Sequence, residues 1–247
     1  TVEKMKKGQK MSTSIITDHK EENIKTLVIS DLHLGNAYER LDMLDEAFNY
    51  CCKEGIHIIF CCGDLIDGTY SRVEKNIVDS KDQIDYFIKN YPFDKSILTF
   101  AVGGDHDISC LYKEGLSIME SMKKYRQDVI IGGYNNTEVF IKNDSVLLTH
   151  HISGGRLHYG SPVSLFGHYH EYKPRVAPDN SLQIHVPTLS DITDTFPTAL
   201  EMELNFEKGY INCVGLKHIY FENGAKTLSE MEYQILYNKH KNNLPID

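Results

Sequence analysis

Five apolar runs in this 247-residue chain each end directly at a short cluster rich in aspartate and histidine. The runs are residues 26–30, 57–62, 97–102, 146–149 and 163–166, and the clusters are Asp31-Leu32-His33, Gly63-Asp64, Gly103-Gly104-Asp105-His106-Asp107, His150-His151 and Gly167-His168-Tyr169-His170. Short apolar runs bounded by polar segments predict buried strands. Because open α/β sheets bind ligands at the carboxyl ends of their strands, the clusters should meet at one edge. Asp67-Gly68 and Asp191 are weaker members of the series and are read as turn residues.

The periodicity between the runs changes from helical to β-type along the chain. Apolar spacing predicts helices over residues 41–53, 73–90, 111–124 and 228–239. After Gly132 short β-runs dominate, with turns expected at 142–144 and 207–209. The sequence therefore predicts an α/β fold, a two-sheet αββα sandwich with a metal site at the carboxyl-terminal edge of its strands. We expect three segments: a polar tail or linker (1–23), one principal domain (24–220) and a C-terminal helical extension (221–247).

Composition narrows the class of partner. The formal charge of −9 disfavours a broad nucleic-acid surface, because such surfaces need clustered Lys and Arg. No apolar run is long enough to span a membrane, and the lysine-rich start lacks the apolar segment of a secretion signal. The six cysteines show no C-x-x-C spacing, which favours a reduced protein and a cytoplasmic location.

The spacing of the acids and imidazoles indicates metal chemistry. Asp31 and His33 lie two residues apart at a strand exit, so in extended geometry both side chains face one way and can hold one cation. The carboxylate of Asp64 can bridge two cations. His168 and His170 repeat the two-residue spacing after a glycine that allows a tight turn.

A strand-end histidine completes this set. His150 is favoured over His151, because it continues the strand directly and alternation lets only one of the two face the metals. Nitrogen and carboxylate ligands together suit Mn, Fe, Zn, Co or Ni better than Ca. We expect two divalent or trivalent transition-metal ions, with Mn favoured.

The motifs taken in order resemble those of the calcineurin-like metallophosphoesterase family: D-x-H, G-D, G-N-H-D or G-N-H-E, a strand-end H, and G-H-x-H. The resemblance spans residues 27–170. It implies one metal held by Asp31, His33, Asp64 and His170, and a second held by Asp64, Asp105, His150 and His168. It also implies that His106 faces the substrate and that Asp107 orients the His106 imidazole.

One position departs from the family pattern. Asp105 stands where the family has Asn, and its extra negative charge should hold the second metal more tightly and make it a weaker Lewis acid.

These features predict a metal-dependent hydrolase of phosphate esters, a phosphodiesterase for small or nucleotide-type substrates. Two cations sharing Asp64 would lower the pKa of a bridging water to supply hydroxide, and His106 would protonate the leaving oxygen. Arg156 could grip a phosphate bidentately, or could be a solvated loop residue. Two alternatives remain open: a DNA or RNA nuclease of the same superfamily, and a non-catalytic interaction module that keeps the fold.

Overall fold

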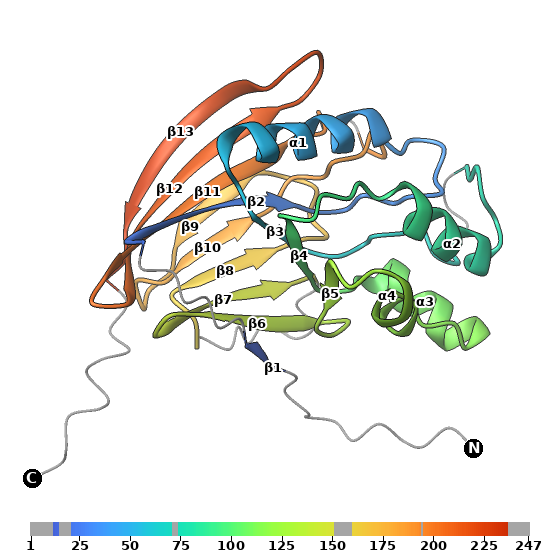
Figure 1. Ribbon diagram of the computed structural model, residues 1–247, viewed down its shortest axis with the longest axis horizontal. Helices are drawn as coiled ribbons and strands as arrows, with labels where there is room; N and C mark the ends of the chain where they lie inside the picture. The colour runs from blue at the N-terminus through green and yellow to red at the C-terminus, as the bar shows by residue number, and fades with distance from the viewer. Residues whose placement is uncertain (1–11, 15–20, 71–73, 151–159, 194, 237–247) are drawn as a thin grey trace, which may run out of the picture.

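The computed structural model describes residues 12–14, 21–70, 74–150, 160–193 and 195–236. Two mixed β-sheets lie face to face, and helices cover the outer side of one of them (Figure 1). The two-sheet α/β sandwich predicted from the sequence is therefore confirmed.

The larger sheet has seven strands and carries the first three polar clusters. Its strands, in spatial order, are β13 (Lys226–Gln234), β12 (Tyr210–Tyr220), β11 (Ala199–Glu207), β2 (Asn23–Ile29), β3 (Ile58–Cys61), β4 (Leu98–Ala101) and β5 (Val129–Ile131). Strands β2 to β5 run parallel to one another, so their carboxyl ends lie at one edge.

The smaller sheet has six strands and carries the histidine clusters. Its order is β1 (Ser12–Ser14), β6 (Asn136–Ile141), β7 (Asp144–Thr149), β8 (Val163–Phe166), β10 (Leu182–His185) and β9 (Lys173–Val176). β7 and β8 are parallel neighbours, which brings the residues after Thr149 and Phe166 together. The predicted turns at 142–144 and 207–209 do connect antiparallel pairs, β6 to β7 and β11 to β12.

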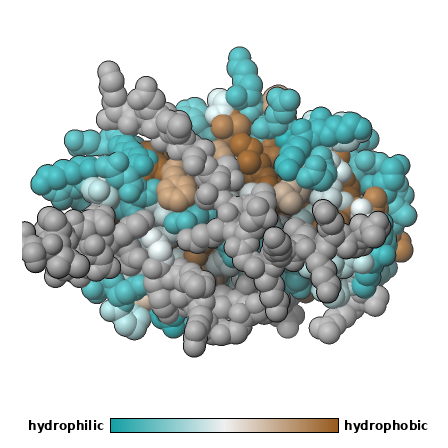
Figure 2. Space-filling model, turned by 90° about the horizontal axis from the view of Figure 1, so that it is seen from below, coloured by the Kyte–Doolittle hydropathy of each residue, from teal (hydrophilic) through white to brown (hydrophobic). Residues whose placement is uncertain are grey.

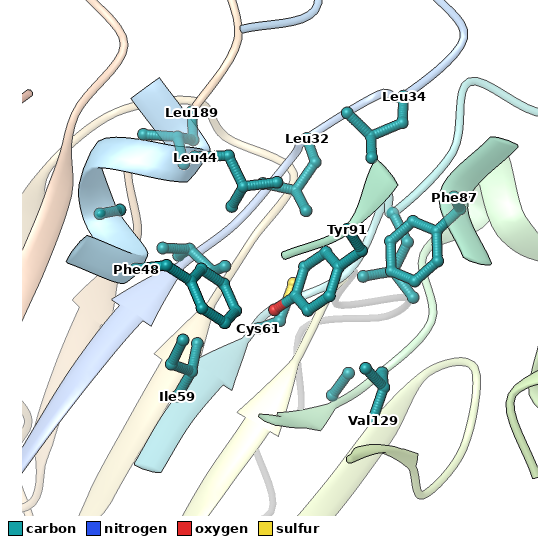
Figure 3. Packing of buried hydrophobic residues seen from close by; sticks show 14 of the residues in the cluster. Leu32, Leu34, Leu44, Phe48, Ile59, Cys61, Phe87, Tyr91, Val129 and Leu189 are labelled. Atoms are coloured by element: carbon teal, nitrogen blue, oxygen red, sulfur yellow. The ribbon is translucent and has the colours of Figure 1, made fainter. Parts of the chain in front are cut away.

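Two apolar clusters hold the layers together. Successive strand residues point to opposite faces, so Leu27 and Ile29 pack under the helices while Val28 packs between the sheets, all three fully buried. In the helix-side cluster, the rings of Phe48 and Phe87 contact the Tyr91 ring at centroid distances of 5.3 and 4.8 Å (Figure 3). Burying each such side chain contributes roughly 1.5–3 kcal/mol to stability.

Four helices contribute buried side chains to that cluster: α1 (Leu41–Glu54), α2 (Ser80–Asn90), α3 (Asp105–Glu114) and α4 (Ile118–Tyr125). The second helix begins later than predicted, because the Asp79 carboxylate accepts the backbone N–H groups of Lys81 and Asp82 and so caps it. The third predicted helix is two helices, because Gly115 ends α3 in the left-handed conformation (φ 72°).

The predicted C-terminal helix is wrong: residues 226–234 form the edge strand β13, paired antiparallel with β12. Leu228 and Met231 imitate helical spacing, but Tyr233 and Ile235 recur at a spacing of two and pack on the cluster between the sheets. The predicted N-terminal tail also contributes structure, since β1 pairs with β6.

None of the helices in the described part of the chain combines the length and the apolar character that a membrane span requires. On the face shown in Figure 2, hydrophobic side chains are visible in patches among hydrophilic ones.

Candidate metal centre

The strand ends of both sheets converge at one edge of the sandwich. The backbone N–H of Asp31 donates to the carbonyl of Gly63 (2.9 Å), and the N–H of His33 donates to the carbonyl of Asp64 (3.0 Å). In the other sheet the N–H of Gly167 donates to the carbonyl of Thr149 (2.9 Å). These bonds continue the strand pairing beyond the strands and fix the loops that carry the polar clusters.

One ligand group contains Asp31, His33 and His170, whose candidate ligand atoms lie within 4.8 Å of one another. His170 Nε2 is 3.1 Å from Asp31 Oδ1, and His33 Nε2 is 3.9 Å from the same oxygen. The Asp31 carboxylate also accepts the hydroxyl of Ser30 (2.5 Å) and the backbone N–H of His168 (3.1 Å). These hydrogen bonds orient the carboxylate.

A second group contains Asp64, Asp105, His150 and His168, again within 4.8 Å. His150 Nε2 lies 3.0 Å from both Asp64 Oδ2 and Asp105 Oδ1, and His168 Nδ1 lies 3.2 Å from Asp105 Oδ1. The His168 and Asp105 side chains are 38% and 36% exposed. The centre therefore opens to solvent on the side of this second group.

The two groups meet at Asp64. His33 Nε2 is 3.8 Å from Asp64 Oδ2, the same oxygen that faces His150 Nε2. The structure thus brings together all seven residues predicted as metal ligands: Asp31, His33, Asp64, Asp105, His150, His168 and His170.

The protonation states suit a cationic ligand. Burial lowers the pKa of His33 to about 4, so its imidazole is neutral, and both of its ring nitrogens are buried without a hydrogen-bond partner among the described residues. Burial opposes ionisation of Asp31, but its hydrogen bond to His170 and the charge of His150 hold the pKa of Asp31 well below its usual value. An ionised carboxylate beside a neutral, unpartnered imidazole is a donor set for a transition metal.

The second group is charged in the absence of metal. Burial disfavours ionisation of Asp105, but hydrogen bonds from His150 and His168 lower the pKa of Asp105 far below normal. Burial likewise opposes a charge on His150, yet Asp64 and Asp105 raise the pKa of His150 well above 6.5. The hydrogen bond to Asp105 raises the pKa of His168 as well. A metal at this group would displace the imidazole protons, so binding should release protons.

A glycine allows two of these segments to approach closely. A Cβ on Gly104 would lie 1.9 Å from Asp64 Oδ1 and 2.5 Å from the Asp64 backbone nitrogen. The glycine that precedes Asp105 therefore leaves the room that Asp64 occupies.

The predicted extended geometry of the D-x-H segment is wrong, whereas the turn expected after Gly167 is present. Five of the seven candidate ligands have left-handed backbones rather than extended ones: Asp31 (φ 53°), His33 (φ 46°), Asp64 (φ 50°), His168 (φ 73°) and His170 (φ 54°). The side chains converge because the chain turns at each of them, not because a strand alternates.

His106 lies beside the ligands, but a different residue orients it from the one predicted. His106 Nδ1 is 2.6 Å from the carbonyl oxygen of Asp67, and its Nε2 is 4.0 Å from Asp64 Oδ2. The fully buried Asp107 carboxylate instead accepts backbone N–H groups of Leu65, Ile66 and Gly104 (2.8–3.1 Å). Asp107 thus positions the loop after β3, and its predicted role of orienting the imidazole is corrected. Burial and the nearby Asp64 charge raise the pKa of Asp107 to about 7.

Sequence reasoning missed Asp67, which it treated as a turn residue. Its carboxylate is almost fully buried, accepts the Asn36 side-chain amide (2.8 Å), pairs with Lys75 Nζ (3.1 Å) and lies 3.7 Å from His33 Nδ1. The available signal was its position three residues after Asp64, within the same loop. Asp191, by contrast, pairs with Arg40 (3.0 Å) and remains a surface residue. Arg156 and His151 lie outside the described residues.

Comparisons with known proteins give a family and a fold. A family model described as calcineurin-like phosphoesterase matches residues 24–226. Comparison with curated proteins gives no match. Among solved structures, an archaeal phosphodiesterase is 20% identical and has a TM-score of 0.53, with 79% of this chain and 99% of that chain covered.

Two other solved structures share the fold. Yfce, a phosphoesterase from E. coli, is 13% identical with a TM-score of 0.50, covering 84% of this chain and 98% of its own. GAP50, the anchor in the inner membrane complex of Plasmodium, is 10% identical with a TM-score of 0.50, covering 87% of this chain and 90% of its own. At these identities the likeness extends to the fold alone.

Proposed function

The chain belongs to the calcineurin-like phosphoesterase family, and on that premise we propose that it is a phosphodiesterase that hydrolyses small or nucleotide-type esters with two bound metal ions. The observation that carries this proposal is the junction of two ligand groups at Asp64. A carboxylate shared by two cations is the arrangement of two-metal phosphoesterases. We propose Mn²⁺ as the favoured ion, because mixed nitrogen and oxygen ligands accept it.

Charge supports two cations rather than a metal-free site. The buried acids Asp31, Asp64, Asp67 and Asp107 crowd around the centre with the partly exposed Asp105. Burying several carboxylates together costs free energy unless opposite charge compensates them. Lys75 compensates Asp67, and three backbone N–H groups meet Asp107. Metal ions would compensate Asp31, Asp64 and Asp105 in place of imidazole protons.

When bound, such ions would activate a water molecule and offset charge on the phosphoryl oxygens. The protein's own contribution is a placed proton donor. A carbonyl oxygen can only accept a hydrogen bond, so His106 Nδ1 carries a hydrogen and donates it in a hydrogen bond to the Asp67 carbonyl. His106 Nε2 is left to face the substrate. In the proposed reaction a water molecule loses one proton to solvent and its oxygen forms a bond to phosphorus. The bond to the leaving oxygen breaks, and a proton on His106 Nε2 passes to that oxygen, which leaves the imidazole with its Nδ1 proton.

The location proposed from the cysteines is a reducing compartment such as the cytoplasm. All six cysteines are free thiols, and five of them are buried.

The test combines metal analysis with hydrolysis of bis(p-nitrophenyl) phosphate and p-nitrophenyl phosphate in added Mn²⁺. Purified protein should contain about two metal ions per chain and should prefer the diester. Asp64→Asn, which removes the shared charge at nearly constant volume, should lower both metal content and turnover. Asp191→Asn is the matched control, because Asp191 is an exposed aspartate paired with Arg40 outside the centre.

Protein that binds no metal and hydrolyses neither ester would contradict the proposal and would favour the interaction module. Steeply salt-dependent binding of duplex DNA, together with its cleavage, would favour the nuclease alternative.

A further inference from the structure

Tyr70 lies against the proposed proton donor. Its ring centroid is 4.6 Å from the His106 imidazole centroid, with an angle of 50° between the rings. Tyr70 is 37% exposed, so part of its side chain faces solvent. The Tyr70 ring therefore borders both solvent and the proposed proton donor.

Helix α3 holds this segment in place. The Ser109 hydroxyl donates to the carbonyl of His106 (2.6 Å) and accepts the backbone N–H of Thr69 (2.9 Å). From the same helix, Lys113 Nζ donates to the Thr69 carbonyl (3.3 Å) and lies 5.4 Å from the Tyr70 ring centroid. Two hydrogen bonds therefore tie the residue before Tyr70 to the helix that carries His106.

We propose that Tyr70 determines leaving-group specificity, which rests on the proposed hydrolase function, and that it selects phosphodiesters whose leaving group is a nucleoside. His106 Nε2 must come within hydrogen-bond distance of the leaving oxygen. The group attached to that oxygen then extends next to Tyr70. An aromatic side chain stacks with any nucleobase, whereas a leaving group without a flat ring gains much less from it.

The chain contains a matched aromatic pair away from the centre. Lys124 Nζ lies 4.6 Å from the ring centroid of Tyr125, which is 56% exposed. Tyr125 ends α4 just before β5, at the amino end of the parallel strands, whereas the metal ligands follow their carboxyl ends. Tyr125→Leu therefore removes a more exposed ring beside a lysine without approaching His106.

The experiment uses two substrates that differ only in one base. One is a thymidine dinucleotide, and the other is the same diester with an abasic sugar in the leaving position. The value of kcat/KM is measured with Mn²⁺ for the natural chain, Tyr70→Leu, Tyr70→Phe and Tyr125→Leu. Because both leaving groups depart through the same alcohol oxygen, a general disturbance of His106 slows both substrates alike and cancels in their ratio.

The natural chain should prefer the base-bearing substrate by about tenfold or more, the range expected for one base stacked on one aromatic ring. Tyr70→Leu should abolish that preference, while Tyr70→Phe and Tyr125→Leu should keep it. An unchanged preference in Tyr70→Leu, or no preference in the natural chain, would overturn the assignment. Hydrolysis of bis(p-nitrophenyl) phosphate without hydrolysis of either dinucleotide would also overturn the role of Tyr70, but would leave the hydrolase function intact. If the natural chain hydrolysed none of these substrates, the hydrolase function itself would be refuted.

Discussion

Replacing Gly104 with alanine should damage the centre while leaving the fold intact. The new Cβ would lie 1.9 Å from Asp64 Oδ1, whereas real Cβ contacts essentially never fall below 3.0 Å, so something must move by at least 1.1 Å (3.0 − 1.9). Part of that movement involves the Asp64 backbone nitrogen, at 2.5 Å, and a rotation of the carboxylate cannot relieve it. A displacement of about 1 Å at a reacting centre can lower the rate about 100-fold.

The cost in stability should be much smaller than the cost in activity. Overpacking one buried position typically costs about 1–3 kcal/mol. For a chain of this size that corresponds to a decrease in Tm of about 2–12 °C. Gly104 itself has an extended backbone (φ −109°), so an alanine there adds a steric conflict but no backbone strain.

The assay is metal content by mass spectrometry together with kcat/KM on bis(p-nitrophenyl) phosphate. Gly160→Ala is the control, because a Cβ there meets no atom of the described residues within 4 Å. We expect Gly104→Ala to retain fewer metal ions and about 1% of the activity, with Gly160→Ala unchanged. If Gly104→Ala matched Gly160→Ala in both measurements, the close approach to Asp64 would not matter for the centre.

Two further predictions concern the centre, and one concerns the buried imidazole of His218. His106→Gln should lower kcat about 100-fold or more on a diester with an alkyl leaving group. The decrease should be much smaller on bis(p-nitrophenyl) phosphate, because its leaving group needs little protonation. Equal decreases on the two substrates would show that His106 is not the general acid. Asp105→Asn should weaken binding of one Mn²⁺ by about tenfold, measured by titration calorimetry, with kcat at saturating metal equal or higher; an unchanged affinity would contradict the charge argument. Burial lowers the pKa of His218 below 6.5, so the stability contributed by its neutral form is present above pH 6.5 and is lost as the pH falls through the lower, folded-state pKa. The free energy of unfolding, measured with urea, should therefore fall less between about pH 7.5 and about pH 5.5 for His218→Gln than for the natural chain. Equal decreases in the two proteins would refute this.

The strands that end at the polar clusters were predictable because burial on both faces leaves short, largely apolar runs. β3 and β8 are buried along their whole length, and their sequences are entirely or mostly apolar. β13 was not predictable in this way, because as an edge strand it buries little and its apolar residues fit either period. Its assignment depends on hydrogen bonds to β12, which are contacts between segments that no local pattern records.

The ligand residues were predictable by type and place, but the roles around His106 were not. Histidine and aspartate at strand exits carry a chemical signal that survives in the sequence. The roles of Asp67 and Asp107 leave no such signal, because His106 Nδ1 bonds the backbone carbonyl of Asp67, a group that every residue has. Which of them meets His106 depends on how α3 docks on the loop after β3.

The left-handed backbones of the candidate ligands have to be held in place by the surrounding fold. Each non-glycine residue in that conformation costs roughly 1–2 kcal/mol, although aspartate tolerates it better than most residues. The other described non-glycine residues with positive φ, such as Asn180 and Lys208, lie in turns outside the centre. At the centre, the N–H groups of Asp31 and His33 bond to the loop that follows β3, so two adjacent strands force both turns at once. The sheet therefore holds these turns in place, which positions the candidate ligand side chains close together.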